Sequence, residues 1–171
     1  FWPILLSMEN NNLKNYAFVD GQNVNLGTKR FNWRFDWKKF RVYLRDKYNV
    51  GVAYIFLGFL PKNQSLYTAL QEYGYILCLK QVNFLKDGDV KWNVDVDLSV
   101  QAWRDEFNYQ KAVLVTSDGD FYPLVQILKE KGKFGVVLSS ERKTCSKHLR
   151  KAAAGEIYYL DTLRSKLEYK N

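Results

Sequence analysis

Carboxylates follow two apolar runs of the chain, and they are its clearest chemical signal. Asp20 ends one run, and Asp118 and Asp120 follow another. Like charges held within a few ångströms raise each other's pKa or require a cation. No Lys or Arg lies within residues 20–27 or 116–127 to neutralise these acids. If the two stretches converge, a bound divalent cation is therefore the simplest compensation.

A third acid comes from a predicted helix over residues 94–107. At 100° per residue, four apolar side chains of this helix form one stripe. The stripe consists of Val96, Val100, Trp103 and Phe107. Asp95 and Asp97 lie on opposite flanks of it, so a regular helix cannot turn both toward one metal. Asp95 shares its flank with the small residues Ser99 and Ala102, which allow close approach, and we therefore predict Asp95 as a ligand.

The predicted ligands are all oxygen atoms, which favours Mg²⁺ or Mn²⁺ over zinc. Such ions activate water and stabilise the charge on a transferring phosphoryl group. Asn23 either positions one of the ligands or satisfies the backbone of its loop. A zinc site is excluded, because Cys78 and Cys145 have no ligand spacing and His148 is the single histidine.

Each acidic motif also has a structural interpretation. Asp20 with Gly21 is a common turn, Asp120 suits the N-cap of a following helix, and Asp95 near a helix start favours the helix dipole. The conjunction of acids at two strand ends and one helix is more informative than any of them alone.

Short apolar runs alternate with helical patterns and must position these acids. We predict strands at residues 16–20, 52–57, 75–79, 112–116, 135–138 and 156–160. We predict helices at residues 37–47, 65–72, 94–107, 121–131 and 146–153, with Gly74 and Gly132 ending two of them. Strands that are apolar on both faces and separated by helices indicate a parallel sheet covered on both sides, an α/β/α sandwich. Sites in such sheets form beyond the carboxyl ends of the strands.

Length and charge limit the remaining possibilities. The 171 residues suit one domain, predicted over residues 15–171 after an extension at 1–14 whose first seven residues are apolar. No run is long enough to cross a bilayer, so we expect no membrane partner. Two unpaired cysteines indicate a reducing, cytoplasmic setting. The net charge of +8 indicates a polyanionic partner, unless the basic surface only keeps the protein soluble.

Basic and aromatic residues give tentative contacts for such a partner. The candidates for phosphate contact are Lys29, Arg30, Lys91, Arg142, Lys143, Lys147 and Arg150. Trp33 and Trp92 are candidates for stacking on bases. Taken singly, each of these residues has an ordinary surface or core role as its alternative.

Three motifs resemble those of NYN domains, the LabA-like branch of the PIN-like nucleases. They are FVDGQNV at 18–24, KWNVDVDL at 91–98 and VTSDGDFYPL at 115–124, and SKHLRKAA at 146–153 resembles the family's last helix. The resemblance spans about residues 15–161. It implies a PIN-like, Rossmannoid sheet with the first and fourth strands adjacent at its centre, and RNA cleavage that depends on Mg²⁺ or Mn²⁺.

By position, the resemblance assigns the acidic sites to Asp20, Asp95, Asp118 and Asp120. It assigns the conserved amide to Asn23 and the hydroxyl positions to Thr116 and Ser117. We therefore expect a ribonuclease that hydrolyses phosphodiester bonds in RNA, with single-stranded DNA as a further substrate left open. The substrate RNA, endo- or exonucleolytic action, oligomeric state and pathway also stay open.

Two departures from the family pattern support an alternative. Gln101 and Ala154 stand where the family often has Asp, which favours an RNA-binding module with a degenerate metal site. A phosphatase of the haloacid dehalogenase type is a third hypothesis, suggested by Asp20 with Gly21. Phe18 argues against it, because that family needs a nucleophilic Asp at this position.

Overall fold

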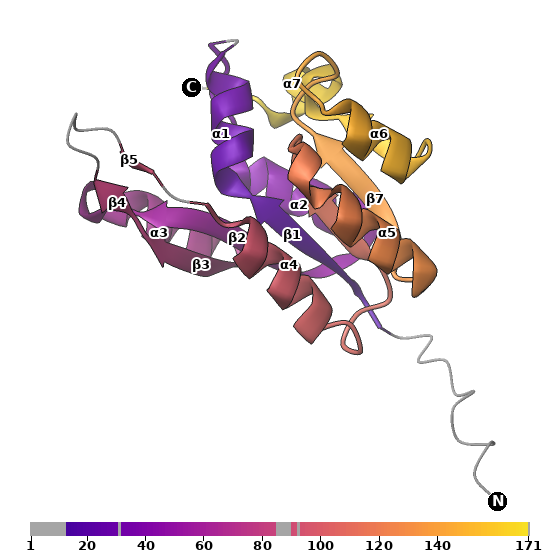
Figure 1. Cartoon of the computed structure of the whole chain (residues 1–171). Coiled ribbons are helices and arrows are strands. Elements are labelled where there is room, and N and C mark those ends of the chain that lie inside the picture. Colours follow the sequence, from indigo (N-terminus) through magenta and orange to yellow (C-terminus); the bar gives the residue numbers. More distant parts are fainter. Residues whose placement is uncertain (1–12, 31, 85–89, 92, 171) are drawn as a thin grey trace, which may run out of the picture.

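The computed structural model describes residues 13–30, 32–84, 90–91 and 93–170, and its centre is a six-stranded parallel sheet (Figure 1). The strand order is β3-β2-β1-β6-β7-β8. The strands are β1 (Asn15–Asp20), β2 (Val50–Phe59), β3 (Tyr75–Gln81), β6 (Ala112–Val115), β7 (Phe134–Ser139) and β8 (Ile157–Tyr159). The predicted first and fourth strands, β1 and β6, are adjacent at the centre, as expected.

Helices cover both faces of the sheet, which confirms the predicted α/β/α sandwich. The helices are α1 (Gly21–Lys29), α2 (Trp37–Tyr48), α3 (Gln64–Glu72), α4 (Asp95–Arg104), α5 (Tyr122–Glu130), α6 (Lys147–Ala153) and α7 (Arg164–Leu167). Buried residues of α1, α2, α3 and α7 pack into one core, and those of α4, α5 and α6 pack into a second core on the opposite face. Short 3-10 helices lie at Pro61–Asn63, Gly119–Phe121 and Leu160–Leu163, and β4 (Asn83–Phe84) pairs antiparallel with β5 (Val90–Lys91).

The central strands are apolar on both faces because both faces are covered. All four residues of β6 are buried, and Ala17 of β1 pairs with Ala53 on one side and Val113 on the other. Gly74 and Gly132 follow α3 and α5 with φ of +87° and +65°. This left-handed conformation commonly ends a helix, and glycine adopts it without the steric penalty that a Cβ atom brings. Both helix ends were expected from the sequence.

Helix α1 corrects the prediction that a loop follows Asp20. The helix contains two glycines and two asparagines, which are poor helix formers. Asp20 accepts a hydrogen bond from the Asn23 backbone amide and so caps the helix, and Val24 is fully buried against the sheet. Tertiary packing therefore outweighs the low intrinsic propensity of this segment.

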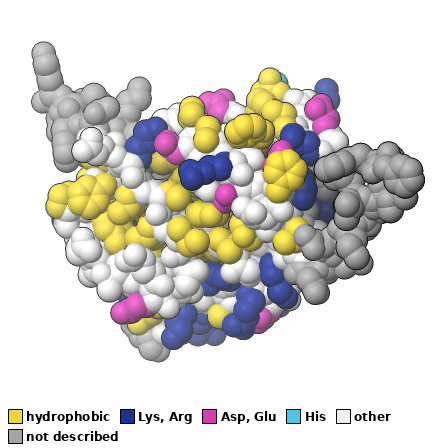
Figure 2. All heavy atoms as spheres, turned by 90° about the horizontal axis from the view of Figure 1, so that it is seen from below, with side chains coloured by type: hydrophobic (Ala, Val, Ile, Leu, Met, Phe, Trp, Pro, Cys, Tyr) yellow, Lys and Arg dark blue, Asp and Glu magenta, His cyan; other side chains and the backbone are white. Residues whose placement is uncertain are grey.

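The apolar stripe predicted on α4 is not the face of the helix that packs on the sheet. Leu98 and Ala102 are the residues that pack on the sheet, and both are fully buried. The stripe of Val96, Val100, Trp103 and Phe107 is 69%, 53%, 62% and 80% exposed. Figure 2 views the molecule from the side where α4 ends and shows hydrophobic side chains in a band across that face. Periodicity does not identify the packed face of this helix, because the outer face of α4 carries larger apolar residues than the face that meets the sheet.

Both cysteines are free: Cys145 is buried, and Cys78 is half-buried. None of the helices in the described ranges is long and apolar enough to cross a bilayer.

Candidate metal centre

The carboxyl ends of β1 and β6 bring together acids that are far apart in sequence. Asp20 is the last residue of β1, and Asp118 follows β6 by three residues. Asp95, Asp118 and Asp120 each offer a carboxylate oxygen, and these oxygens lie within 4.8 Å of one another. Asp95 and Asp118 also line a small pocket with Asp20, of about 200 Å³. The structure thus brings the four predicted acids to one end of the sheet.

Asp20 is the most buried of the four acids, with a relative exposure of 5%. Its pKa is raised from 3.8 to about 6, mainly by burial. The nearby charges of Asp95 and Asp118 contribute to this rise, and its hydrogen bonds to Asn23 and Thr116 oppose it. The ionised form of Asp20 therefore costs more free energy than that of an exposed carboxylate, and a nearby positive charge would lower this cost.

Backbone and hydroxyl donors hold the strand-end acids in place. Thr116 Oγ1 lies 3.3 Å from Asp20 Oδ2, to which it donates, and 3.1 Å from the amide nitrogen of Asp118, from which it accepts. Asn23 Oδ1 accepts from the Ser117 amide at 2.9 Å, which ties α1 to the end of β6. Ser117 Oγ is 2.8 Å from Ser139 Oγ on β7. The residues expected as supporting groups therefore connect the three strands that end here.

The structure separates Asp95 from Asp97, as the helical geometry predicts. Burial raises the pKa of Asp95, its hydrogen bond to Asn93 lowers it, and Asp118 and Asp120 raise it. Asn93 Nδ2 donates to Asp95 Oδ2 at 2.9 Å, and Asn93 Oδ1 accepts from the Asp95 amide at 2.7 Å. Asp97 instead forms an ion pair of 2.6 Å with Lys80 on β3.

Asn93 is a site residue that was not predicted from the sequence. Its position two residues before Asp95 at a helix start is the pattern in which an Asn side chain bonds the backbone ahead of it. The structural roles of the other acids are partly real as well. Asp20 caps α1, and Asp118, rather than Asp120, accepts the amide hydrogen bond that begins the 3-10 helix.

The chemistry of this cluster suits a hard divalent cation. Mg²⁺ and Mn²⁺ prefer carboxylate oxygens, and metal–oxygen distances of about 2.0–2.6 Å let one ion bridge oxygens as close as these. In the part of the chain that the structure describes, the ion pairs involve none of the four acids.

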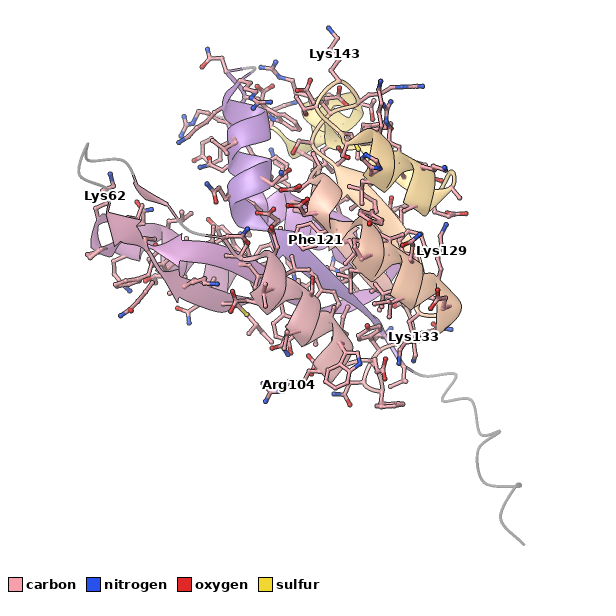
Figure 3. All side chains as sticks on the ribbon, viewed as in Figure 1. Lys62, Arg104, Phe121, Lys129, Lys133 and Lys143 are labelled. Carbon is pink, nitrogen blue, oxygen red and sulfur yellow. The ribbon has the colours of Figure 1, made fainter. Side chains whose placement is uncertain are left out.

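The tentative nucleic-acid contacts differ in how exposed the structure leaves them. Trp33 is 5% exposed in the core, so its indole is not available for stacking, and that expectation is wrong. The side chain of Lys91 and all of Trp92 lie outside the described residues. The exposed basic candidates are Lys29, Arg30, Arg142, Lys143 and Lys147, and Arg150 is half-buried. Figure 3 shows Lys143 projecting from the tip of its loop, beyond the end of α6.

Comparison with known proteins gives three consistent findings. Residues 15–161 match the model of the NYN domain family. The "Low amplitude and bright protein LabA" of Synechococcus elongatus is 25% identical over 134 residues, which cover 72% of each chain. A crystal structure of a protein of unknown function from Vibrio parahaemolyticus superposes with a TM-score of 0.76 at 21% identity, over 95% of this chain and 100% of the other.

Proposed function

We propose that this chain, which belongs to the NYN domain family, is a metal-dependent ribonuclease that hydrolyses phosphodiester bonds at its aspartate cluster. The family is PIN-like and of the nuclease type. The observation that carries the proposal is the convergence of Asp95, Asp118 and Asp120 within 4.8 Å, beside the buried carboxyl group of Asp20. Membership of the family gives the class of chemistry, and the preserved acids support its retention in this chain.

The roles of the residues follow from their contacts. Asp20, Asp95, Asp118 and Asp120 would hold Mg²⁺ or Mn²⁺, which supplies activation of water and stabilises negative charge on the phosphoryl oxygens. Thr116 donates to the Asp20 carboxylate and accepts from the Asp118 backbone amide, and the Asn23 side chain accepts from the Ser117 amide, so these residues would position the backbone that carries the ligands.

RNA is the proposed substrate, and the net charge of +8 would attract its phosphates. Single-stranded DNA serves as the comparison substrate. Because Cys78 and Cys145 are both free, a reducing compartment such as the cytoplasm is the proposed setting.

Cleavage of a mixed single-stranded RNA in Mn²⁺, with an EDTA control, tests the proposal. Asp118→Asn should lower the rate by about 100-fold or more, because even indirect metal partners typically contribute about 10–100-fold. Asp97→Asn is the matched control, since Asp97 lies on α4 but pairs with Lys80 away from the cluster. Cleavage that survives Asp118→Asn, in a protein with an unchanged circular dichroism spectrum, would refute the assignment.

The alternative is an RNA-binding module with a degenerate metal site. The side chain of Gln101 donates to Asp105, and Ala154 ends α6 in the left-handed conformation. Neither residue lines the pocket of Asp20, Asp95 and Asp118, and the four principal acids are present without them. This favours catalysis over binding alone. Salt-dependent RNA binding with no products in Mn²⁺ would support the alternative.

A further inference from the structure

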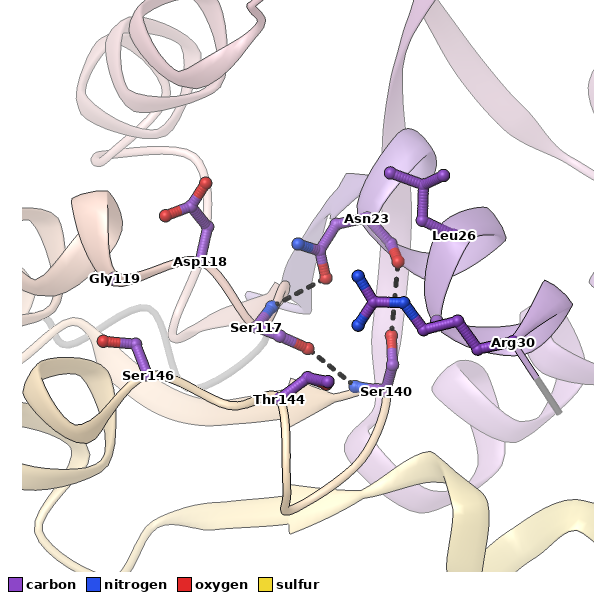
Figure 4. Close-up of a pocket in the computed structure, with 10 residues that line it drawn as sticks. Asn23, Leu26, Arg30, Ser117, Asp118, Gly119, Ser140, Thr144 and Ser146 are labelled. Carbon is purple, nitrogen blue, oxygen red and sulfur yellow. Dashed lines mark hydrogen bonds between the residues drawn. The ribbon is translucent and has the colours of Figure 1, made fainter.

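A second pocket lies next to the aspartate pocket, between α1 and the loop that joins β7 to α6 (Figure 4). Its volume is about 290 Å³, and it shares Asn23, Leu26 and Asp118 with the aspartate pocket. The other lining residues are Gly27, Arg30, Ser117, Gly119, Ser140, Thr144 and Ser146. We call it the Arg30 pocket.

Hydrogen-bond donors dominate the lining of the Arg30 pocket. The guanidinium of Arg30, the amide nitrogen Nδ2 of Asn23 and the hydroxyl of Thr144 have no hydrogen-bond partner among the described residues. Ser146 Oγ accepts from the His148 amide, which leaves its own proton free to donate. Figure 4 shows Arg30 extending toward Ser140 and Asn23.

One acid also lines the Arg30 pocket, but it belongs to the neighbouring cluster. Figure 4 shows the carboxylate of Asp118 turned away from Ser140 and Thr144. The two adjoining pockets therefore have opposite chemistry. One gathers carboxylates and suits a cation, and the other gathers donors and suits an anion.

Close packing holds the donors of the Arg30 pocket in place. A Cβ atom at Gly27 would lie 2.4 Å from Ser140 Cβ, and one at Gly119 would lie 2.5 Å from Ser146 Oγ. Glycine at both positions lets α1 and the start of the 3-10 helix approach the loop this closely. Donors held in place before binding lose less freedom when a ligand arrives.

We propose that the Arg30 pocket binds a phosphate group of the RNA strand, next to the phosphodiester that lies at the aspartate cluster. This inference rests on the proposed function, because it takes the strand as the shared ligand of both pockets. A phosphate presents only acceptors, and arginine binds it with two parallel hydrogen bonds. Hydroxyl and amide donors such as Thr144 and Asn23 are common phosphate partners in nucleic-acid complexes. The volume is slightly below the range of about 300–1,000 Å³ for sites of drug-sized ligands, in keeping with a group as small as a phosphate.

Binding without cleavage tests the Arg30 pocket separately from the nuclease activity. The probe is a fluorescent single-stranded RNA of twelve nucleotides in EDTA, with affinity measured by fluorescence anisotropy across a salt series. Arg30→Gln should weaken binding by about 10-fold, as expected for the loss of one charge-assisted contact. It should also reduce the slope of log affinity against log salt by about 0.7, the value for one phosphate of a single strand.

Arg104→Gln is the matched control, because Arg104 is exposed at the far end of α4 from this pocket (Figure 3). Its affinity and salt slope should equal those of the unchanged protein. Thr144→Val keeps the shape of the side chain and removes its donor, and it should weaken binding by a smaller factor than Arg30→Gln. Thermal unfolding of each variant verifies that the fold is intact.

An unchanged affinity and salt slope for Arg30→Gln would overturn this inference, whether or not the protein cleaves RNA. A loss of binding in a protein that gives no products would instead support the inference and refute the nuclease. Probes with a 5′-phosphate and a 5′-hydroxyl distinguish the source of the phosphate. An effect of Arg30→Gln confined to the phosphorylated probe indicates a terminal phosphate, and an equal effect indicates an internal one.

Discussion

Asp20 combines a structural and a chemical task in one carboxyl group. One oxygen caps α1 and the other accepts from Thr116, yet the group is buried beside two further acids. The hydrogen bonds fix the orientation of the carboxyl group, and its burial makes the ionised form unfavourable. Residues at functional sites are often kept at such a cost to stability.

The raised pKa of Asp20 predicts how the metal-free protein responds to pH. Its pKa is about 6 in the folded chain against 3.8 for the ordinary side chain, so the folded state holds the proton more tightly. The free energy of unfolding should therefore fall as the pH rises from 4 to above 6, by about 2–3 kcal/mol from this group. Asp20→Asn should remove that loss and stabilise the protein at pH 7 in EDTA but not at pH 4. Urea unfolding at both pH values measures it.

Asp36→Asn is the control for this prediction. Asp36 caps α2 by the same kind of hydrogen bond, to the Lys39 amide, but lies outside the acidic cluster. It should give no stabilisation at pH 7. If Asp20→Asn destabilises the protein equally at both pH values, the cap outweighs the electrostatic cost and the prediction is wrong.

Binding of a cation should be measurable without any substrate. Mn²⁺ at about 100 times its dissociation constant should stabilise the protein by about 2.7 kcal/mol, because a ligand that binds only the folded state shifts the equilibrium. Asp95→Asn should abolish most of this shift, and Asp97→Asn should leave it in place. A thermal unfolding scan with and without Mn²⁺ measures both variants. An equal shift in the two would contradict the assignment of Asp95.

At the scale of elements, α4 shows which side of a helix packs. Leu98→Ala should lower the free energy of unfolding by about 2–5 kcal/mol, because Leu98 is fully buried against the sheet. Val100→Ala, on the exposed stripe of the same helix, should change it by less than about 0.5 kcal/mol. Chemical denaturation measures both. A larger effect at Val100 would mean that the stripe packs against the rest of the chain.

The sequence predicted the strands better than their surroundings. Apolar runs such as Ala112–Val115 are buried on both faces, which leaves one interpretation. Helix α4 has apolar residues on two sides, and periodicity alone cannot say which side meets the sheet. Helix α1 has weak propensity, and its cap and the burial of Val24 became visible only in three dimensions. Trp33 was misplaced for a related reason, since aromatic and polar residues alternate around it and this alternation does not say which aromatics are buried.

At the scale of the molecule, the acids could be predicted because a parallel sheet gathers its carboxyl ends on one edge. Helical geometry alone separated Asp95 from Asp97. The donors of the Arg30 pocket could not be predicted as a set, because Ser140, Thr144 and Ser146 are common loop residues whose convergence on Arg30 depends on the packing of α1.

Because β1 lies at the centre of the sheet, between β2 and β6, the acidic cluster can form only after β6 has been synthesised. Thr116, the partner of Asp20, is translated 96 residues after it, which takes about 5–20 s at ribosomal rates of about 5–20 residues per second. Until β6 leaves the ribosome, β1 lacks one of its two neighbours and the first carboxylate has no companions. The domain therefore emerges beside messenger and ribosomal RNA without an assembled centre, and acquires one only after β6 and the loop that follows it have been made.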